Sequence, residues 1–227
     1  MRGLAERPPV PVALGALTVV SGLIDAVSFL ALGRVFTANM TGNLILLGFA
    51  AAGEPGFDIA ASLTALGAFL VGAGIAARLA AALAGREPHR WFLSAVSAEA
   101  ALTAVAGGCA FLAPRYPAVA ALALAMGLRN ATVNRLAVPD MTTTVLTRTI
   151  TALAGDLVVR SAADRPATTR RLASVIALVA GAVAGALLVR HLATGWVLVL
   201  VACLQALVAA AHHAHVVLRR RAGLPDR

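Results

Sequence analysis

The sequence predicts an all-α integral membrane protein: a polytopic helical bundle of about six spans with two short broken or re-entrant helices. Of the 227 residues, 60% are hydrophobic and only 13% are charged, about half the charged share of an ordinary soluble chain. The apolar residues gather in runs of about 20, the length that a helix needs to cross a bilayer. One offset also aligns the two halves of the chain with each other. This composition excludes a soluble enzyme, a disordered chain and a disulfide scaffold.

Six apolar runs are long enough to span a membrane, and two further segments are apolar but short. The fourth run is the weakest because four polar residues interrupt it, namely Arg129, Asn130, Asn134 and Arg135. The short segments are rich in Thr, Asn and Gly, which predicts half-helices or re-entrant turns. The expected spans cover residues 11–32, 59–77, 91–113, 118–138, 172–189 and 196–217, and the short segments cover 38–53 and 145–156.

Arginine placement favours six crossings over eight, because short loops rich in arginine remain in the cytoplasm. With six crossings and cytoplasmic termini, the outer loops keep only Arg34, Arg115 and Arg190, together with the acids Glu54 and Asp58. The arginines expected on the inner side are at positions 2, 7, 86, 90, 160, 165, 170, 171 and 219–221. We therefore expect a multi-pass protein of the bacterial cytoplasmic (inner) membrane with both termini in the cytoplasm.

The net charge of +9 comes from nineteen arginines and ten acids, with no lysine. Arginines in cytoplasmic loops attract anionic lipid headgroups, by about 1 kcal/mol each near the surface. The bilayer and these headgroups are therefore the expected partners. Nucleic acid is not an expected partner, because no groove motif of aromatic and basic residues accompanies the charges. The sequence leaves open whether the chain forms a homo-oligomer.

An offset of 105 to 106 residues aligns the halves at several separate places. The aligned pairs are residues 22–26 with 127–131, residues 40–44 with 146–150, Trp91 with Trp196, and Glu99 with Gln205. Three crossings in each half would insert the second half upside down. We therefore expect two inverted three-span repeats, residues 11–113 and 117–217, in one membrane domain with a basic cytoplasmic tail at 218–227. In such folds the ligand site lies near the bilayer midplane, where interrupted helices meet.

Asp25 lies within the first span, on a polar stripe with Thr18, Ser21 and Ser28 at helical spacing. A carboxylate there costs about 2.5 to 3.5 kcal/mol on insertion scales, so it should face the bundle interior and find a partner. Arg129 of the second half is the expected partner. Such a pair could line a solute or proton path, or it could only hold two helices together.

Residues 37–43, Thr-Ala-Asn-Met-Thr-Gly-Asn, have the composition of a helix start. At membrane depth, such a turn would aim its backbone amides at an anion or a polar solute. The second copy replaces Gly42 with Arg148, which either adds positive charge to the same pocket or extends to the cytoplasmic headgroups. The candidate substrate-binding residues are Asp25, Asn39, Thr41, Gly42, Asn43, Arg129, Asn130, Asn134, Thr147 and Arg148.

Other polar and small residues have simpler expected roles. Glu99 and Gln205 should hydrogen-bond between helices. Gly181 and Gly185, with Ala68 and Gly72 in the other half, form small-residue faces for close helix packing. These features are typical of membrane helices and do not by themselves indicate a function.

No enzyme motif is present: the sequence has no Gly-x-Ser-x-Gly, His-Glu-x-x-His, Walker loop or Cys-x-x-Cys. We therefore expect neither catalysis nor a cofactor or metal. An intramembrane acid–base enzyme that uses Asp25 and Glu99 is a less favoured alternative.

Residues 22–29 (GLIDAVSF) and 35–43 (VFTANMTGN) resemble the first motif of the YoaK-like family of bacterial membrane proteins, the domain of unknown function DUF1275. Residues 127–131 and the threonine-rich stretch 142–151 resemble its second motif. Where that motif commonly has Gln before Asn, and Thr-Gly in the threonine run, this chain has Arg129 and Arg148. The resemblance extends over nearly the whole chain. It implies a polytopic inner-membrane protein of about six spans and supplies no substrate.

Together these observations predict a transporter or permease that binds a small polar or anionic solute at the interface of the repeats. The alternative is a membrane scaffold that binds a partner protein or lipid and transports nothing.

Overall fold

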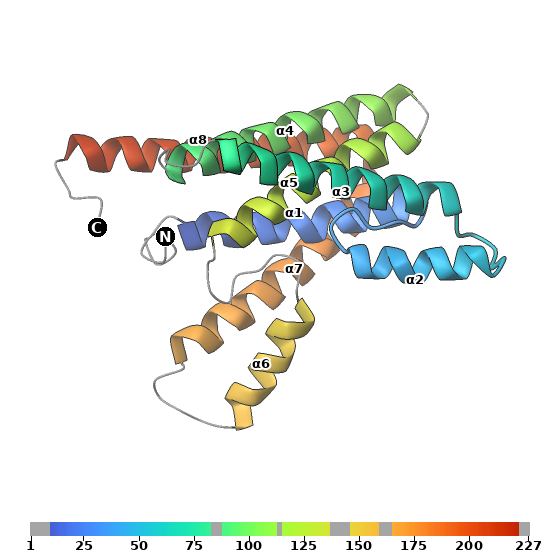
Figure 1. Ribbon diagram of the computed structural model, residues 1–227, viewed down its shortest axis with the longest axis horizontal. Helices are drawn as coiled ribbons and strands as arrows, with labels where there is room; N and C mark the ends of the chain where they lie inside the picture. The colour runs from blue at the N-terminus through green and yellow to red at the C-terminus, as the bar shows by residue number, and fades with distance from the viewer. Residues whose placement is uncertain (1–9, 83–87, 113–114, 137–145, 159–164, 223–227) are drawn as a thin grey trace.

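The computed structural model describes residues 10–82, 88–112, 115–136, 146–158 and 165–222, and every regular element in them is an α-helix. Figure 1 shows the long helices side by side in one bundle, with α6 and the first part of α7 projecting from it. The eight helices are α1 (Val10–Ala31), α2 (Met40–Ala51), α3 (Ile59–Ala82), α4 (Pro88–Leu112), α5 (Arg115–Leu136), α6 (Leu146–Val158), α7 (Arg165–His191) and α8 (Thr194–Arg221).

Five of these helices, α1, α3, α4, α7 and α8, are long and apolar enough to cross a membrane. The fourth expected span coincides with α5, a helix of 22 residues whose composition is too polar for that criterion. α5 packs along both α3 and α4 and has a fully buried stripe that includes Val119 and Leu122. A helix surrounded by other helices needs little apolar surface facing lipid, so its polarity is compatible with a place inside the bundle.

The two short segments fold as the short helices α2 and α6, as the sequence predicts. With 12 and 13 residues, they are about 18 and 20 Å long, too short for roughly 30 Å of hydrocarbon. α2 packs against α3, and α6 packs against α7. Figure 1 shows α2 returning toward the end of the bundle at which α3 begins, so α2 adds no crossing.

Two helix pairs cross at glycines, where the backbones touch. In the pair α1 and α7, a Cβ on Gly22 would overlap the backbone at Leu178, and a Cβ on Gly181 would overlap it at Val19. The pair α3 and α5 repeats this arrangement, with Gly72 against Leu124 and Gly127 against Phe69. Gly185 also approaches the backbone at Leu23. The close packing expected at Gly72, Gly181 and Gly185 is therefore confirmed.

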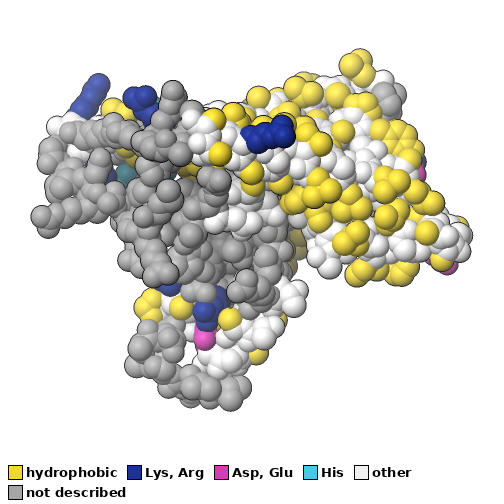
Figure 2. All heavy atoms as spheres, in the orientation of Figure 1, with side chains coloured by type: hydrophobic (Ala, Val, Ile, Leu, Met, Phe, Trp, Pro, Cys, Tyr) yellow, Lys and Arg dark blue, Asp and Glu magenta, His cyan; other side chains and the backbone are white. Residues whose placement is uncertain are grey.

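The outer surface of the bundle is apolar. Many large hydrophobic side chains are exposed on α2, α3 and α7, and Figure 2 shows them gathered over the part of the molecule that α2 and α3 form. A soluble monomer rarely exposes a continuous apolar surface of this kind. The exposed side chains include Leu44, Ile45, Phe49, Leu63, Leu70, Val71, Ile176, Val179 and Val183. The protein is a multi-pass membrane protein with a helical bundle fold.

Several helices extend beyond the apolar runs, among them α7 and α8. α7 begins at Arg165 rather than at residue 172, and α8 continues to Arg221, so the first residues of the expected basic tail are helical. Hydropathy locates where a helix leaves the hydrocarbon, but the helix itself continues as long as good helix formers such as Arg, Ala and Leu follow.

Candidate functional site

The carboxylate of Asp25 holds the loop between α1 and α2 inside the bundle. Its Oδ1 accepts hydrogen bonds from the backbone amides of Thr37, over 2.9 Å, and Ala38, over 2.8 Å. Asp25 lies six residues before the end of α1, so the loop descends about 9 Å along that helix. Thr37 and Ala38 are buried. The loop is therefore re-entrant, and an internal carboxylate satisfies its buried amides.

Asn43 locks the other side of the same loop. Its Oδ1 accepts from the amide of Phe36 over 2.8 Å, and its Nδ2 donates to the Phe36 carbonyl. Asn39 caps α2 by accepting from the amide of Gly42 over 3.3 Å. The Phe36 ring stacks on Phe29 and lies so close to Gly42 that a side chain there would overlap it.

These contacts give Asp25, Asn39, Gly42 and Asn43 a common role in shaping the loop. The sequence predicted that the loop amides would point at an anion or a polar solute, whereas the amides of Thr37 and Ala38 donate to Asp25 of the protein itself. Thr41 is exposed and makes no contact that adds to this arrangement.

Arg129 does not pair with Asp25, and this expectation is wrong. Its Nε donates to Oε2 of Glu99 over 2.8 Å, and its Nη2 donates to the other carboxylate oxygen. Its Nη1 donates to the carbonyl of Leu17, over 2.8 Å, and to Oγ of Ser21, over 2.6 Å. The two carboxylates face different elements: Asp25 faces its own re-entrant loop, whereas Glu99 on α4 faces α5.

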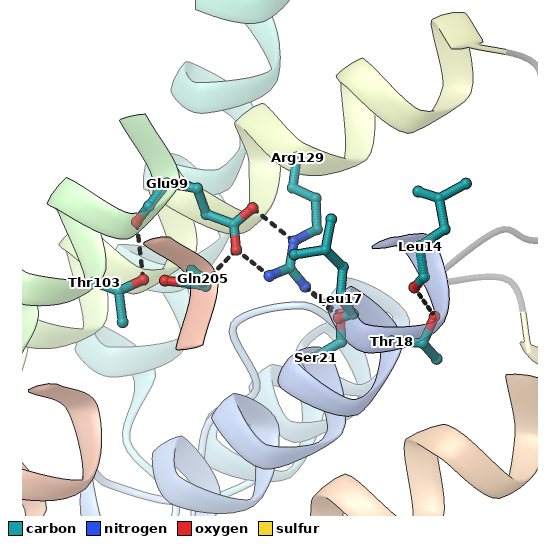
Figure 3. A network of polar contacts seen from close by, with 8 residues as sticks. All are labelled: Leu14, Leu17, Thr18, Ser21, Glu99, Thr103, Arg129 and Gln205. Carbon is teal, nitrogen blue, oxygen red and sulfur yellow. Dashed lines mark hydrogen bonds and ion pairs between the residues drawn. The ribbon is translucent and has the colours of Figure 1, made fainter. Parts of the chain in front are cut away.

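A polar network around Glu99 joins α1, α4, α5 and α8 (Figure 3). Gln205 of α8 donates from its Nε2 to Oε1 of Glu99, so the expected hydrogen bond between these residues is confirmed. Glu99 is 1% exposed, Arg129 3% and Gln205 0%. Ser21, Glu99 and Gln205 all lie near the midpoints of their helices. The network is therefore central in the bundle and shielded from its surroundings.

Gln205 retains an unused acceptor. Its Oε1 is buried and has no hydrogen-bond partner among the described residues. Buried amide oxygens without a partner are uncommon and costly, so the network leaves one acceptor unsatisfied.

The Glu99–Arg129 pair could have been found from the sequence. α4 ends at Leu112, α5 begins at Arg115, and the two helices pack against each other. Glu99 precedes the end of α4 by nearly as many residues as Arg129 follows the start of α5, so antiparallel packing puts both side chains at one depth. The polar stripe along the first span favoured Asp25 as the partner of Arg129 instead.

The remaining candidate residues differ in their exposure. Asn130 is half-buried, and Asn134 and Thr147 are exposed. The Arg148 side chain lies outside the part of the chain that the structure describes. A cleft at the loop end of the bundle is lined by none of the predicted site residues. Within the described residues, no three His, Cys, Asp or Glu side chains are grouped to hold a metal ion.

Comparison with known proteins agrees with this architecture. The sequence profile of a family described as "Protein of unknown function (DUF1275)" matches residues 13–211. A Bacillus subtilis (strain 168) protein named "UPF0700 transmembrane protein YoaK" is 32% identical over 151 residues, which are 63% of this chain. The matched chain spans 65% of the length of that relative. No solved structure is significantly similar.

Proposed function

This chain belongs to the DUF1275 family, whose profile matches residues 13–211, and we propose that it transports a small polar or anionic solute across the bacterial cytoplasmic membrane. The observation that carries the proposal is the buried network of Arg129, Glu99, Gln205 and Ser21 at the centre of the bundle. We propose this transport role in place of catalysis, with both termini in the cytoplasm.

A gain in folding stability does not by itself explain why such a network is buried. A buried ion pair can often be replaced by apolar residues of similar size without loss of stability, because desolvation offsets the attraction between the charges. Ionisable residues inside membrane helices are costly and typically mark solute or proton pathways. Four helices contribute groups to this network, so movement of any of them changes the environment of Arg129.

We further propose that the bundle is built from two inverted repeats, α1 to α4 and α5 to α8. Reciprocal packing supports this: α1 packs on α7 as α5 packs on α3. The glycines occupy equivalent places in the two crossings: Gly22 and Gly127, at the repeat offset, contact α7 and α3, and Gly181 and Gly72 contact α1 and α5. Glu99 and Gln205, which the repeat aligns, bond to each other directly. Residues related by a two-fold axis touch when they lie on it, which favours an axis between α4 and α8.

Arg129 is the group in this network that suits an anionic solute. Its guanidinium presents several donors in a plane that matches a carboxylate or phosphate. In the present state Glu99 accepts from two of its nitrogens, Nε and Nη2. A monovalent anion that takes the place of Glu99 would leave that carboxylate buried without its cation. Glu99 would then take up a proton from water, so that one proton enters with each anion and the net charge of the network stays unchanged.

Flux measurements on reconstituted protein test the proposal. Proteoliposomes are given a panel of small anions, including monocarboxylates and phosphate, with and without a pH gradient. We expect uptake of at least one anion above empty vesicles, faster when the outer solution is more acidic. The double variant Glu99→Leu/Arg129→Leu should remain folded and lose uptake.

Two outcomes of these flux measurements would overturn the transport proposal. Flux equal to that of empty vesicles across the panel would favour a membrane scaffold that binds a partner or lipid. Uptake by the folded double variant at the rate of the natural sequence would show that the ion pair has no part in transport.

A further inference from the structure

A second group of charged residues lies outside the central network, at the end of the bundle where α3 and α5 begin. It lines a cleft of about 620 Å³. The walls come from the loop after α1, the end of α2, the loop before α3 and the first residue of α5. The lining residues that matter here are Gly33, Arg34, Gly56, Phe57, Asp58 and Arg115.

Arg34 is held in a backbone conformation that its side chain disfavours. Its φ is +55°, in the left-handed region that few residues other than glycine adopt. The preceding residue, Gly33, also has a positive φ, +107°, and there the sequence does have a glycine. A non-glycine residue in such a conformation persists where its surroundings fix it, and such positions cluster at functional sites.

The surroundings fix the Arg34 guanidinium at the cleft. It lies over the Phe57 ring, 5.9 Å from the centroid, at a distance typical of a cation–π contact. Its Nη1 occupies the space where a side chain on Gly56 would be, 2.8 Å from the position of a Cβ there. The arginine is therefore positioned by an aromatic ring and a glycine rather than by a carboxylate.

The charges that line the cleft do not cancel. Arg115 donates to Oδ2 of Asp58, which also accepts from the Tyr116 hydroxyl over 2.8 Å. Arg34 has no ion pair among the described residues, and Glu54 of the nearby loop does not line the cleft. Two arginines thus face one carboxylate that is already engaged, which leaves one positive charge directed into an open hollow.

We propose that this cleft binds a single carboxylate or phosphate group, which Arg34 holds through its guanidinium while Arg115 contributes the neighbouring positive charge. Arginine presents paired donors that match the oxygens of either group. The anionic group belongs either to a free solute or to a lipid headgroup. The inference concerns binding alone and does not require that the protein transports anything.

Titration of purified protein in nanodiscs of phosphatidylcholine tests this binding. Inorganic phosphate and acetate are added at low ionic strength, and binding is followed by calorimetry. We expect saturable binding that Arg34→Gln weakens at least tenfold. Asp58→Asn removes the competing charge while retaining a residue suited to the start of α3, so it should tighten binding several-fold. Arg190→Gln, which changes an exposed arginine that does not line the cleft, should leave binding unchanged.

Arg34→Gly separates binding from folding. Glycine adopts the left-handed backbone without strain, so this variant should melt at or above the temperature of the natural protein and still lose binding. A second arm repeats the titration in nanodiscs that contain phosphatidylglycerol, with native mass spectrometry of retained lipid. Lipid retention that depends on Arg34 would identify a headgroup as the source of the anion.

The proposal is overturned if neither phosphate, acetate nor phosphatidylglycerol binds in an Arg34-dependent way. It is also overturned if Arg34→Gln and Arg190→Gln weaken binding equally, because the effect would then be a general one of surface charge. Absence of transport in proteoliposomes leaves these binding results unaffected, so the two proposals fail separately.

Discussion

The Nε of Arg129 donates to Oε2 of Glu99 over 2.8 Å, and neither side chain is more than 3% exposed. Each residue neutralises the other in a setting where either charge alone would be costly. The pair also connects consecutive helices, α4 and α5, at the centre of the bundle. Removing one partner should therefore cost far more stability than removing both.

Single substitutions in this pair should destabilise the fold more than the double one. Arg129→Leu leaves Glu99 buried without its cation, at a cost of about 3–5 kcal/mol, and Glu99→Leu does the same to Arg129. The double variant Glu99→Leu/Arg129→Leu should lie within about 1–2 kcal/mol of the natural protein. Chemical unfolding in mild detergent measures the free energy of unfolding of the two single variants and of the double variant. Additive losses in the double variant would contradict the interpretation of the pair.

Removing the Asp25 carboxylate should release the re-entrant loop. Asp25→Ala deprives the buried amides of Thr37 and Ala38 of their acceptor, at about 1–3 kcal/mol for each amide. Asp25→Asn retains an oxygen at this place and should cost less. Thermal melting in detergent compares the two variants. Equal losses for Asn and Ala would mean that the charge, rather than the acceptor, holds the loop.

Close approach of α3 and α5 should depend on Gly72. In Gly72→Ala the new methyl group meets the backbone of Leu124, which cannot move aside as a side chain would, so we expect a loss of about 1–3 kcal/mol or more. Gly74→Ala, in the same helix, meets nothing within 4 Å and should be neutral or gain up to about 1 kcal/mol from helix propensity. Unfolding free energies in detergent measure the difference, and equal effects of the two substitutions would exclude a tight crossing at Gly72.

The pH dependence of folding stability should depend on the Tyr116 hydroxyl. Its hydrogen bond, the amides of Ala61 and Ala60, and the charge of Arg115 hold the pKa of Asp58 below the ordinary value of 3.8. A lowered pKa stabilises the folded protein above the unfolded value and is lost as the pH falls through the folded one. Tyr116→Phe should therefore lower stability near neutral pH by less than about 1 kcal/mol, because solvent screens this site.

The same variant should differ least from the natural protein in strong acid. The gap in melting temperature should be constant from pH 7 to about pH 5, then narrow below pH 4 as Asp58 is protonated in both proteins. A gap that widens toward acid would contradict this assignment.

Much of the fold follows from the order of the residues. Apolar runs located the long helices, and the short Thr-, Asn- and Gly-rich segments appear as α2 and α6. Polarity also singled out residues 37–43 and Arg129, which do occupy the two polar centres of the bundle. Length and hydropathy suffice for these predictions because a helix in a bilayer must satisfy its backbone internally and bury an apolar surface in lipid.

Only the tertiary structure shows which polar side chains bond to each other. Asp25 and Arg129 are opposite charges within the two aligned motifs, residues 22–26 and 127–131, yet Asp25 binds the loop amides and Arg129 binds Glu99. Which groups meet depends on how each helix is rotated and at what depth it crosses its neighbour. In this bundle glycines set those crossings by allowing backbones to touch, and a hydropathy pattern along one helix carries no information about the face that its neighbour presents.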